Sequence, residues 1–214
     1  MKLYFISGLG ADHRVFARME FEGYECIHLD WIEPKKQESL PSYALRLSQH
    51  IDTKDHALIG VSFGGMLVSE IHRQKGSKAS FLISSTPRSA ILPPIPSTLS
   101  RIFLRKVFLQ IGNPFFKLMS PFLFGVKIKE DKKLLRKIIS ETDLDFLRWA
   151  LRAILGWKTD EPAQVFIQIH GDSDKLVPPK KQQIEHLLEG GHFIVWEKAQ
   201  EIEEIIKSHL QEIS

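Results

Sequence analysis

A serine flanked by glycines is the first pattern in this chain that could carry out chemistry. Ser62 lies in the motif G-x-S-x-G over residues 60–64, with another glycine at Gly65. An apolar run at 57–59 precedes the motif and a helical pattern at 66–71 follows it, which predicts a sharp turn from a buried strand into a helix at Ser62. Glycines suit a strained turn, and the helix start presents free N–H groups to a developing negative charge. The pattern indicates a nucleophilic serine.

A serine hydroxyl is a weak nucleophile near neutral pH, so it needs a histidine as base and a carboxylate that orients the histidine. The sequence offers both, each directly after a predicted strand. Asp174 follows the apolar run 165–169, and His192 follows the run 184–188 and two glycines. Carboxyl ends of parallel strands lie at one edge of a sheet, so we expect these side chains to meet Ser62 there.

The pattern of apolar residues along the chain predicts the strands and helices that would position these residues. Short apolar runs predict six strands, over residues 3–6, 24–29, 57–59, 79–84, 165–169 and 184–188. Segments of helical pattern lie between or after them, over residues 12–19, 40–51, 66–76 and 199–210. This alternation predicts an α/β fold, with a parallel sheet covered by helices on both faces.

The alternation of predicted strands and helices stops after Pro87. Residues 88–160 contain several prolines and helical stretches at 132–140 and 145–155, with no clear strand. We expect a helical cap here, inserted into a core formed by residues 1–87 and 161–214. The cap's large aromatic residues should mostly fill its own small core, while some roof a pocket over Ser62. They are Phe103, Phe108, Phe115, Phe116, Phe122, Phe124, Trp149 and Trp157.

The order of Ser62, Asp174 and His192 along the chain is that of one fold in particular. Residues 60–65 resemble the nucleophile elbow of the α/β-hydrolase family, residues 170–178 its acid loop and residues 190–193 its histidine loop. The resemblance covers nearly the whole chain. It implies a three-layer α/β-hydrolase sandwich, reduced to about six strands because the chain begins at what would be the family's third strand.

The resemblance also implies roles for individual residues. Ser62 would be the nucleophile, His192 the general base and then acid, and Asp174 the orienting carboxylate. The oxyanion hole would be formed by the backbone N–H groups of Leu9 and Phe63.

Two features of these loops need comment. Residues 7–10 resemble the family's His-Gly-x-Gly loop, with Ser7 in place of the usual histidine. This change concerns the packing of the loop, because the implied donor is main chain. In the acid loop, Asp172 is the rival of Asp174; the family's spacing favours Asp174, and Asp172 is expected to stabilise the turn. His170 is expected to buttress the same loop.

Dinucleotide binding is a second interpretation of the N-terminal region. Gly8 and Gly10 follow a predicted strand, and Asp30 ends the next one, as in a Rossmann fingerprint. His13 stands where the third glycine is required, and this interpretation leaves Ser62 and its predicted partners unexplained. His13 is instead a candidate for lining the pocket. Other histidines are expected at surface or packing positions: His28, His56, His72, His186 and His209.

Composition bounds the class of protein. The 214 residues are 43% hydrophobic and 26% charged, which is ordinary for one globular domain and argues against disorder. The net charge of +3 is spread without a basic stripe, so nucleic acid is not an expected partner. Cys26 is the only cysteine, which excludes an intramolecular disulfide and a cysteine metal cluster; we expect it buried in a strand. No secretory signal or membrane-spanning run is evident, so a cytoplasmic location is expected.

Together these features predict a serine hydrolase that cleaves a small ester-like acyl substrate through an acyl-enzyme intermediate, as a carboxylesterase does. The expected partner is that small molecule, and neither a metal nor an organic cofactor is expected. Two alternatives remain open. The same triad could serve a carbon–carbon lyase, or the chain could be a non-catalytic ligand-binding member of the fold.

Overall fold

The computed structural model describes residues 1–88, 114–159, 166–179 and 184–213. Within them, six strands form one sheet in the order β2-β1-β3-β4-β5-β6. Every neighbouring pair is parallel, as predicted. The strands are β1 (Lys2–Ile6), β2 (Glu25–His28), β3 (His56–Val61), β4 (Ala79–Ile83), β5 (Phe166–Gly171) and β6 (His186–Leu188).

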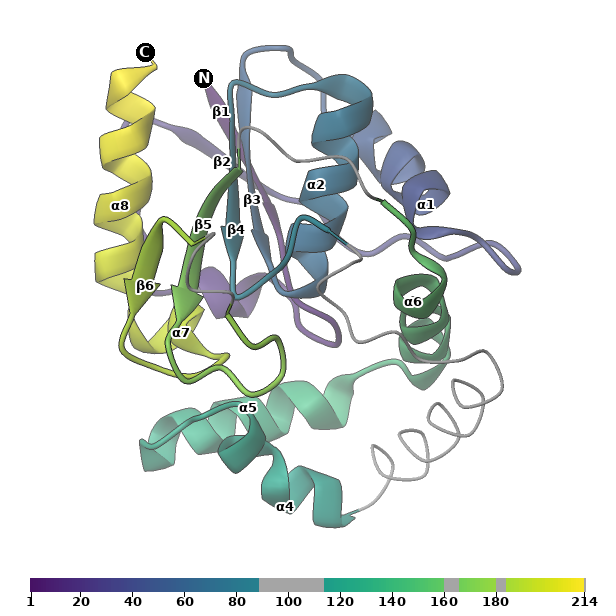
Figure 1. Cartoon of the computed structure of the whole chain (residues 1–214), viewed down its shortest axis with the longest axis vertical. Helices are drawn as coiled ribbons and strands as arrows, with labels where there is room; N and C mark the ends of the chain where they lie inside the picture. The colour runs from purple at the N-terminus through teal and green to yellow at the C-terminus, as the bar shows by residue number, and fades with distance from the viewer. Residues whose placement is uncertain (89–113, 160–165, 180–183, 214) are drawn as a thin grey trace.

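Helices cover both faces of this sheet (Figure 1). One face carries α1 (Leu40–Leu47), which continues into a short 3-10 helix (Ser48–His50), and α2 (Phe63–Lys75). The other face carries α8 (Ala199–Glu212), the short helix α7 (Ile194–Glu197) and the 3-10 helix η1 (His13–Phe16). The predicted three-layer arrangement is confirmed, although the helix expected over residues 12–19 is only this single 3-10 turn.

The strands contribute side chains to two separate apolar cores, because successive side chains of a strand point to opposite faces of the sheet. On β1, Leu3 and Phe5 join the apolar cluster beneath α8, whereas Tyr4 and Ile6 join the cluster beneath α1 and α2. All four side chains are buried. Central strands covered on both faces therefore appear in the sequence as continuous apolar runs.

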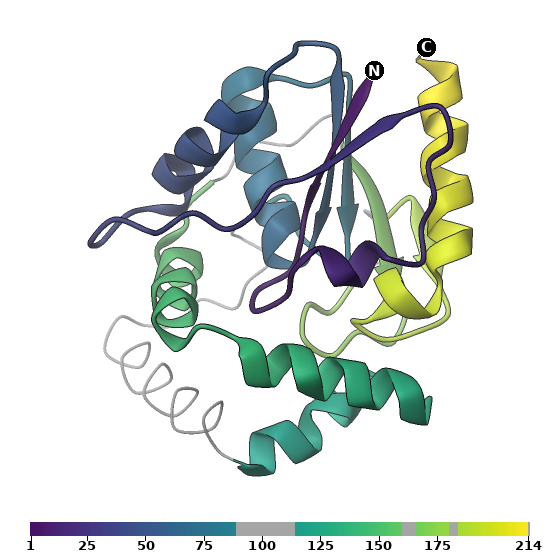
Figure 2. The same ribbon diagram turned by 180° about the vertical axis from the view of Figure 1, so that it is seen from behind.

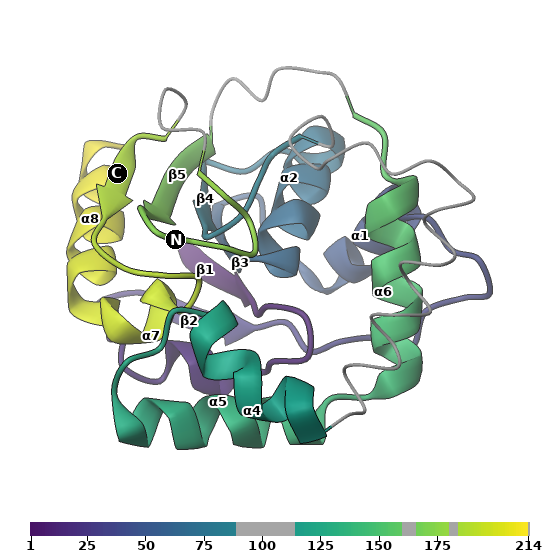
Figure 3. The ribbon, with the colours of Figure 1, turned by 60° about the horizontal axis from the view of Figure 1, so that its bottom comes forward.

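In the described part of the chain between β4 and β5 lie three helices, α4 (Pro114–Leu123), α5 (Lys129–Glu141) and α6 (Leu144–Gly156). Figures 2 and 3 show α4 and α5 across the end of the sheet to which the strands point, with α6 near α1. Leu135 and Ile138 of α5 join the cluster beneath α8, and Trp149 of α6 joins the other one. These helices are therefore packed onto both cores of the sheet.

Two packing expectations are wrong. Trp149 and Trp157 do not fill a separate cap core but pack toward α1 and α2, where their indole N–H groups donate to Glu38 O and Glu70 Oε1 at 2.9 Å and 2.8 Å. Cys26 is exposed, because β2 is the edge strand and that part of it faces solvent. Of the other cap aromatics, Phe122 is exposed. Phe103, Phe108 and the side chains of Phe115 and Phe116 lie outside the described residues.

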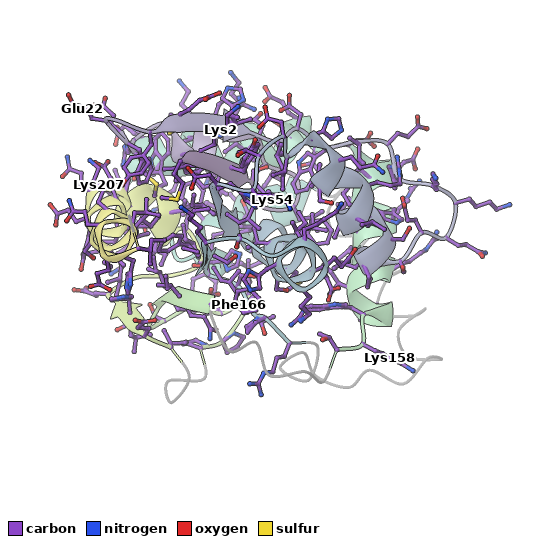
Figure 4. The ribbon with its side chains drawn as sticks, turned by 90° about the horizontal axis from the view of Figure 1, so that it is seen from above. Lys2, Glu22, Lys54, Lys158, Phe166 and Lys207 are labelled. Atoms are coloured by element: carbon purple, nitrogen blue, oxygen red, sulfur yellow. The ribbon has the colours of Figure 1, made fainter. Side chains whose placement is uncertain are left out.

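The end of the sheet at which the strands begin carries paired charges; Lys2 is labelled there in the view of Figure 4. Lys2, at the start of β1, forms ion pairs with Asp52 at 2.9 Å and with Glu25 at 3.2 Å. Exposed pairs of this kind contribute little to stability. Among the described residues, no helix combines the length and apolar character needed to cross a bilayer.

Candidate active site

Ser62, Asp174 and His192 form one hydrogen-bonded chain at the carboxyl ends of β3, β5 and β6. The Nε2 atom of His192 lies 2.9 Å from Ser62 Oγ, and its Nδ1 atom lies 2.7 Å from Asp174 Oδ2. A carboxylate only accepts hydrogen bonds, so it keeps the imidazole proton on Nδ1 and leaves Nε2 free to accept from the serine hydroxyl. The sequence-predicted residues are thus brought together in a geometry that can activate the serine.

The turn at Ser62 is held in a rarely populated backbone conformation, with φ 52° and ψ −117°. Such a conformation costs about 1–3 kcal/mol and persists only where its surroundings enforce it. Here Ser62 N–H donates to Ile83 O at 2.9 Å, and Ser85 Oγ donates to Ser62 O at 2.6 Å. A Cβ on Gly60 would lie 2.5 Å from Gly64 O, which explains the glycine spacing. The turn therefore presents the hydroxyl at the strand end.

Asp174 is buried, and both of its carboxylate oxygens accept hydrogen bonds. Its Oδ1 atom accepts from the N–H groups of Leu176 and Val177 at 2.9 Å and 3.0 Å, while Oδ2 faces His192 and lies 3.2 Å from His170 Nε2. Burial by itself would raise the pKa of Asp174, but the hydrogen bonds from His170 and His192, with that from Val177 N–H, outweigh it. The pKa of Asp174 consequently lies well below its ordinary value, and the group is a carboxylate at neutral pH.

His170 and Asp172, at the start of the acid loop, have different roles. His170 is buried, and its Nε2 atom lies 2.7 Å from Val177 O. A carbonyl only accepts, so Nε2 carries a proton there, and the ring clamps the acid loop as expected of a buttress. Asp172 is exposed and accepts from Gly190 N–H at 3.1 Å. It therefore bonds the turn, and Asp174 is the carboxylate that faces His192.

The loop after β1 is closed by its own hydrogen bonds. Ser7 Oγ and the indole N–H of Trp31 both donate to Ala11 O at 2.9 Å, and Ala11 N–H donates to Gly8 O at 2.9 Å. Ser7 thus tightens the loop at the position of the family's usual histidine. A Cβ on Gly8 would stand 3.5 Å from Ser62 Cβ, so this loop lies directly against the nucleophile turn.

A cavity of about 290 Å³ opens beside Ser62 and His192. Leu9 and Gly8 also line it. Most of its roof is aliphatic and comes from α5 and α6, through Leu135, Ile138, Ile139, Leu147 and Leu151. The aromatic roof expected from the sequence is therefore represented, among the described cap side chains, by Phe124. The spacing of the aliphatic residues along α5 and α6 is a signal that could have identified them.

Phe124 also connects the segment after α4 to the histidine loop. Its ring meets the His192 ring edge-on, with centroids 5.5 Å apart, and its carbonyl accepts from Phe193 N–H at 3.3 Å. Gly125, with φ +77°, follows so closely that a Cβ there would lie 2.7 Å from Gly191 Cα. The segment after α4 therefore supports the loop that carries the imidazole.

The topology of the sheet contradicts the dinucleotide-binding interpretation. The sheet order differs from the 3-2-1-4-5-6 order of the Rossmann fold, and the loop at Gly8 and Gly10 leads into the short η1 rather than into an α-helix that could face a pyrophosphate. Asp30 is exposed at the end of edge strand β2. His13 is exposed too and is not among the residues that line the cavity beside Ser62.

Comparison with known proteins agrees with this architecture. No protein-family model matches the chain, and no curated protein matches it in sequence. Solved structures that do match include an esterase from Thermogutta terrifontis with malate bound, at TM-score 0.75 and 15% identity over 100% of this chain and 90% of that one. A study of carboxylesterases from Nitrososphaera gargenis supplies another, at TM-score 0.73 and 17% identity over 99% and 90%.

A bromoperoxidase from Bacillus anthracis matches as well, at TM-score 0.69 and 15% identity over 98% of this chain and 92% of that one. Proteins named for different activities thus share this architecture, and at such identities the likeness concerns the fold alone. The similarity extends over nearly all of each chain. The chain has the α/β-hydrolase fold.

Proposed function

We propose that the protein is a serine hydrolase that cleaves small ester-like acyl substrates. The observation that carries this proposal is the hydrogen-bonded chain from Asp174 through His192 to Ser62, beside an apolar cavity. Ser62 Oγ attacks the substrate carbonyl carbon while His192 Nε2 takes the hydroxyl proton. His192 then gives this proton to the departing alkoxide, which leaves an acyl group on Ser62. Finally, His192 removes a proton from a water molecule, whose attack releases the acid and restores the serine.

The oxyanion of each tetrahedral intermediate needs two N–H donors aimed at it. Phe63 is the first residue of α2, so its N–H belongs to the group that has no partner within the helix. Leu9 lines the cavity from the loop that packs against the Ser62 turn, and Phe63 directly follows Ser62 in the chain. These positions support Leu9 and Phe63 as the two donors.

The cavity supports a short, aliphatic acyl group as the substrate part that it holds. Its volume of about 290 Å³ is at the small end of ligand pockets, which span about 300–1,000 Å³. The side chains that α5 and α6 contribute are almost all apolar, which favours an uncharged acyl chain. The esterase and carboxylesterase names of the structural neighbours point the same way.

The inserted segment 88–160 is proposed to act as a cap on a core formed by residues 1–87 and 161–214. The support comes from α5 and α6, which both bury side chains in the core clusters and line the cavity. A cap of this kind selects substrates by shape, while the reacting groups stay on the sheet.

The proposal is tested with p-nitrophenyl acetate and butyrate and with a fluorophosphonate label. The wild type should hydrolyse both esters and take up one label, and Ser62→Ala should lose both properties. Ser208→Ala, on the exposed face of α8, is the matched serine control and should behave as the wild type. Turnover that persists in Ser62→Ala would overturn the proposal. Tight ligand binding without turnover or labelling would instead favour a binding protein, and carbon–carbon cleavage without a trapped acyl-enzyme would favour a lyase.

A further inference from the structure

A second cluster of side chains able to do chemistry lies where β6 meets α8. Glu185 immediately precedes β6, His186 begins that strand, and His209 lies in the last turn of α8. The Nε2 atoms of the two imidazoles face each other at 3.0 Å. The Oε1 atom of Glu185 lies 3.9 Å from the first and 3.6 Å from the second. The proposed reaction at Ser62 uses none of these groups.

These separations are close to the spacing of donors around a tetrahedral metal ion. Zinc binds imidazole nitrogen and carboxylate oxygen at about 2.0–2.2 Å, which places neighbouring tetrahedral ligands about 3.3 Å apart. The three donor atoms bracket that value, with the nitrogen pair slightly closer and the oxygen slightly farther. We propose that Glu185, His186 and His209 bind a divalent transition metal ion, with Zn²⁺ as the ion that suits them best.

The facing of the two Nε2 atoms suits a bound metal ion as well as a hydrogen bond between the rings. Without an ion, two neutral imidazoles can share one proton between these nitrogens, and two protonated ones would bring like charges 3.0 Å apart. A cation accepts both lone pairs at once, and the carboxylate of Glu185 balances part of its charge. Two histidines and one carboxylate form a common zinc donor set, with water as the fourth ligand.

The surroundings of His209 fit the same assignment. Its Nδ1 atom lies 3.9 Å from Oε2 of Glu212, so a carboxylate stands on the far side of the ring. Metal-binding histidines generally direct their second ring nitrogen to such an acceptor, which fixes the orientation of the ring. Phe81 packs edge-on against the same imidazole, with ring centroids 6.1 Å apart. Phe81 therefore packs against the His209 ring, and the Glu212 carboxylate stands near its second nitrogen, beyond hydrogen-bond distance.

A metal ion bound here would connect the edge strand β6 to the last helix, α8. β6 has three residues and, within the part of the chain that the structure describes, pairs with β5 alone. Figure 1 shows that β6, the edge strand on this side of the sheet, lies beside α8. The chain continues from β6 directly into the loop of His192. The ion would thus stabilise the strand that leads into this loop without touching the reacting atoms.

The test compares the melting temperature of the full chain, stripped with EDTA, before and after ZnCl₂ is added. Zinc at about 100 times its dissociation constant should raise the melting temperature by about 5–10 °C. One equivalent should bind in calorimetry, and Co²⁺ in its place should give the visible absorption of a tetrahedral site. MgCl₂ should give no shift, since Mg²⁺ prefers octahedral oxygen ligands.

Variants separate this site from other zinc ligands. The double variant His186→Gln and His209→Gln should lose the zinc-dependent shift, while the exposed His50→Gln is the matched control and should keep it. Glu185→Gln removes an exposed carboxylate with little risk to folding and should weaken zinc binding about tenfold or more. No shift in the wild type, or an equal shift in the double variant, would overturn the proposal. The readout does not use hydrolysis, so it is independent of the function proposed for Ser62.

Discussion

Replacing Asp174 by asparagine isolates what the carboxylate does for His192. The two backbone N–H groups of Leu176 and Val177 both point at Oδ1, at 2.9 Å and 3.0 Å. In the variant they will hold the amide oxygen at that position, because only the oxygen can accept from them. The amide nitrogen then takes the place of Oδ2, 2.7 Å from His192 Nδ1. As a donor, it forces the proton of His192 onto Nε2.

An imidazole with its proton on Nε2 cannot accept the proton of Ser62, so the expected effect on catalysis is large. We expect kcat/KM to fall about 10⁴-fold, which corresponds to about 5.5 kcal/mol of transition-state stabilisation. Stability should fall as well, since the new amide N–H₂ group also confronts the protonated Nε2 of His170, 3.2 Å from the original Oδ2. This unfavourable contact should cost about 1–3 kcal/mol.

The assay is hydrolysis of p-nitrophenyl acetate, with circular dichroism to establish that the variant is folded. Asp172→Asn is the matched control in the same loop, because an asparagine there can still accept from Gly190 N–H. It should retain the activity of the wild type. A folded Asp174→Asn protein with activity within tenfold of the wild type would refute the reasoning, as would an equal loss in Asp172→Asn.

Three further predictions concern stability and specificity. The pKa of Asp174 is lowered in the folded protein, so its contribution to stability is present above about pH 4 and is lost as the pH falls below that value. Urea unfolding measured across this range should therefore show that the free energy of unfolding falls more steeply with decreasing pH in the wild type than in Asp174→Asn. Asp131 is buried on α5 and accepts from Trp196 Nε1 at 2.7 Å and from Arg18 at 3.1 Å, so Asp131→Ala should lower the free energy of unfolding by about 2–4 kcal/mol in the same measurement. Ile139→Ala should enlarge the cavity and raise kcat/KM for p-nitrophenyl hexanoate relative to acetate by about tenfold.

The second and third of these predictions each have a control variant. Asp145→Ala removes an exposed carboxylate of α6 and should change the free energy of unfolding by less than about 0.5 kcal/mol. Ile128→Ala removes an exposed side chain before α5 and should leave the preference for acyl length unchanged. Equal effects in a variant and its control would contradict the packing on which these predictions depend. A parallel acid dependence in wild type and Asp174→Asn would contradict the first of them.

Local patterns were enough to predict most of the sheet and the turn at Ser62. Glycines at 60 and 64 and the change from an apolar run to a helical pattern reflect steric limits between atoms a few residues apart, so they are readable along the chain. Each of the six predicted strands has a counterpart in the structure, with ends that differ by a few residues. The helix α4 was not predicted, because Pro121 lies inside it and proline ordinarily marks the end of a helix.

The sequence by itself determined which residue types were available for chemistry and in which order they follow the strands. The spacing of the acid loop already favoured Asp174 over Asp172, and the structure places Asp174 against His192. Only the tertiary structure decided that aliphatic side chains of α5 and α6 cover the cavity and that His186 meets His209. The physical reason is the range of the interactions. A turn is governed by neighbours in the chain, whereas the face that a helix buries and the side chain that a loop presents depend on segments far apart in sequence.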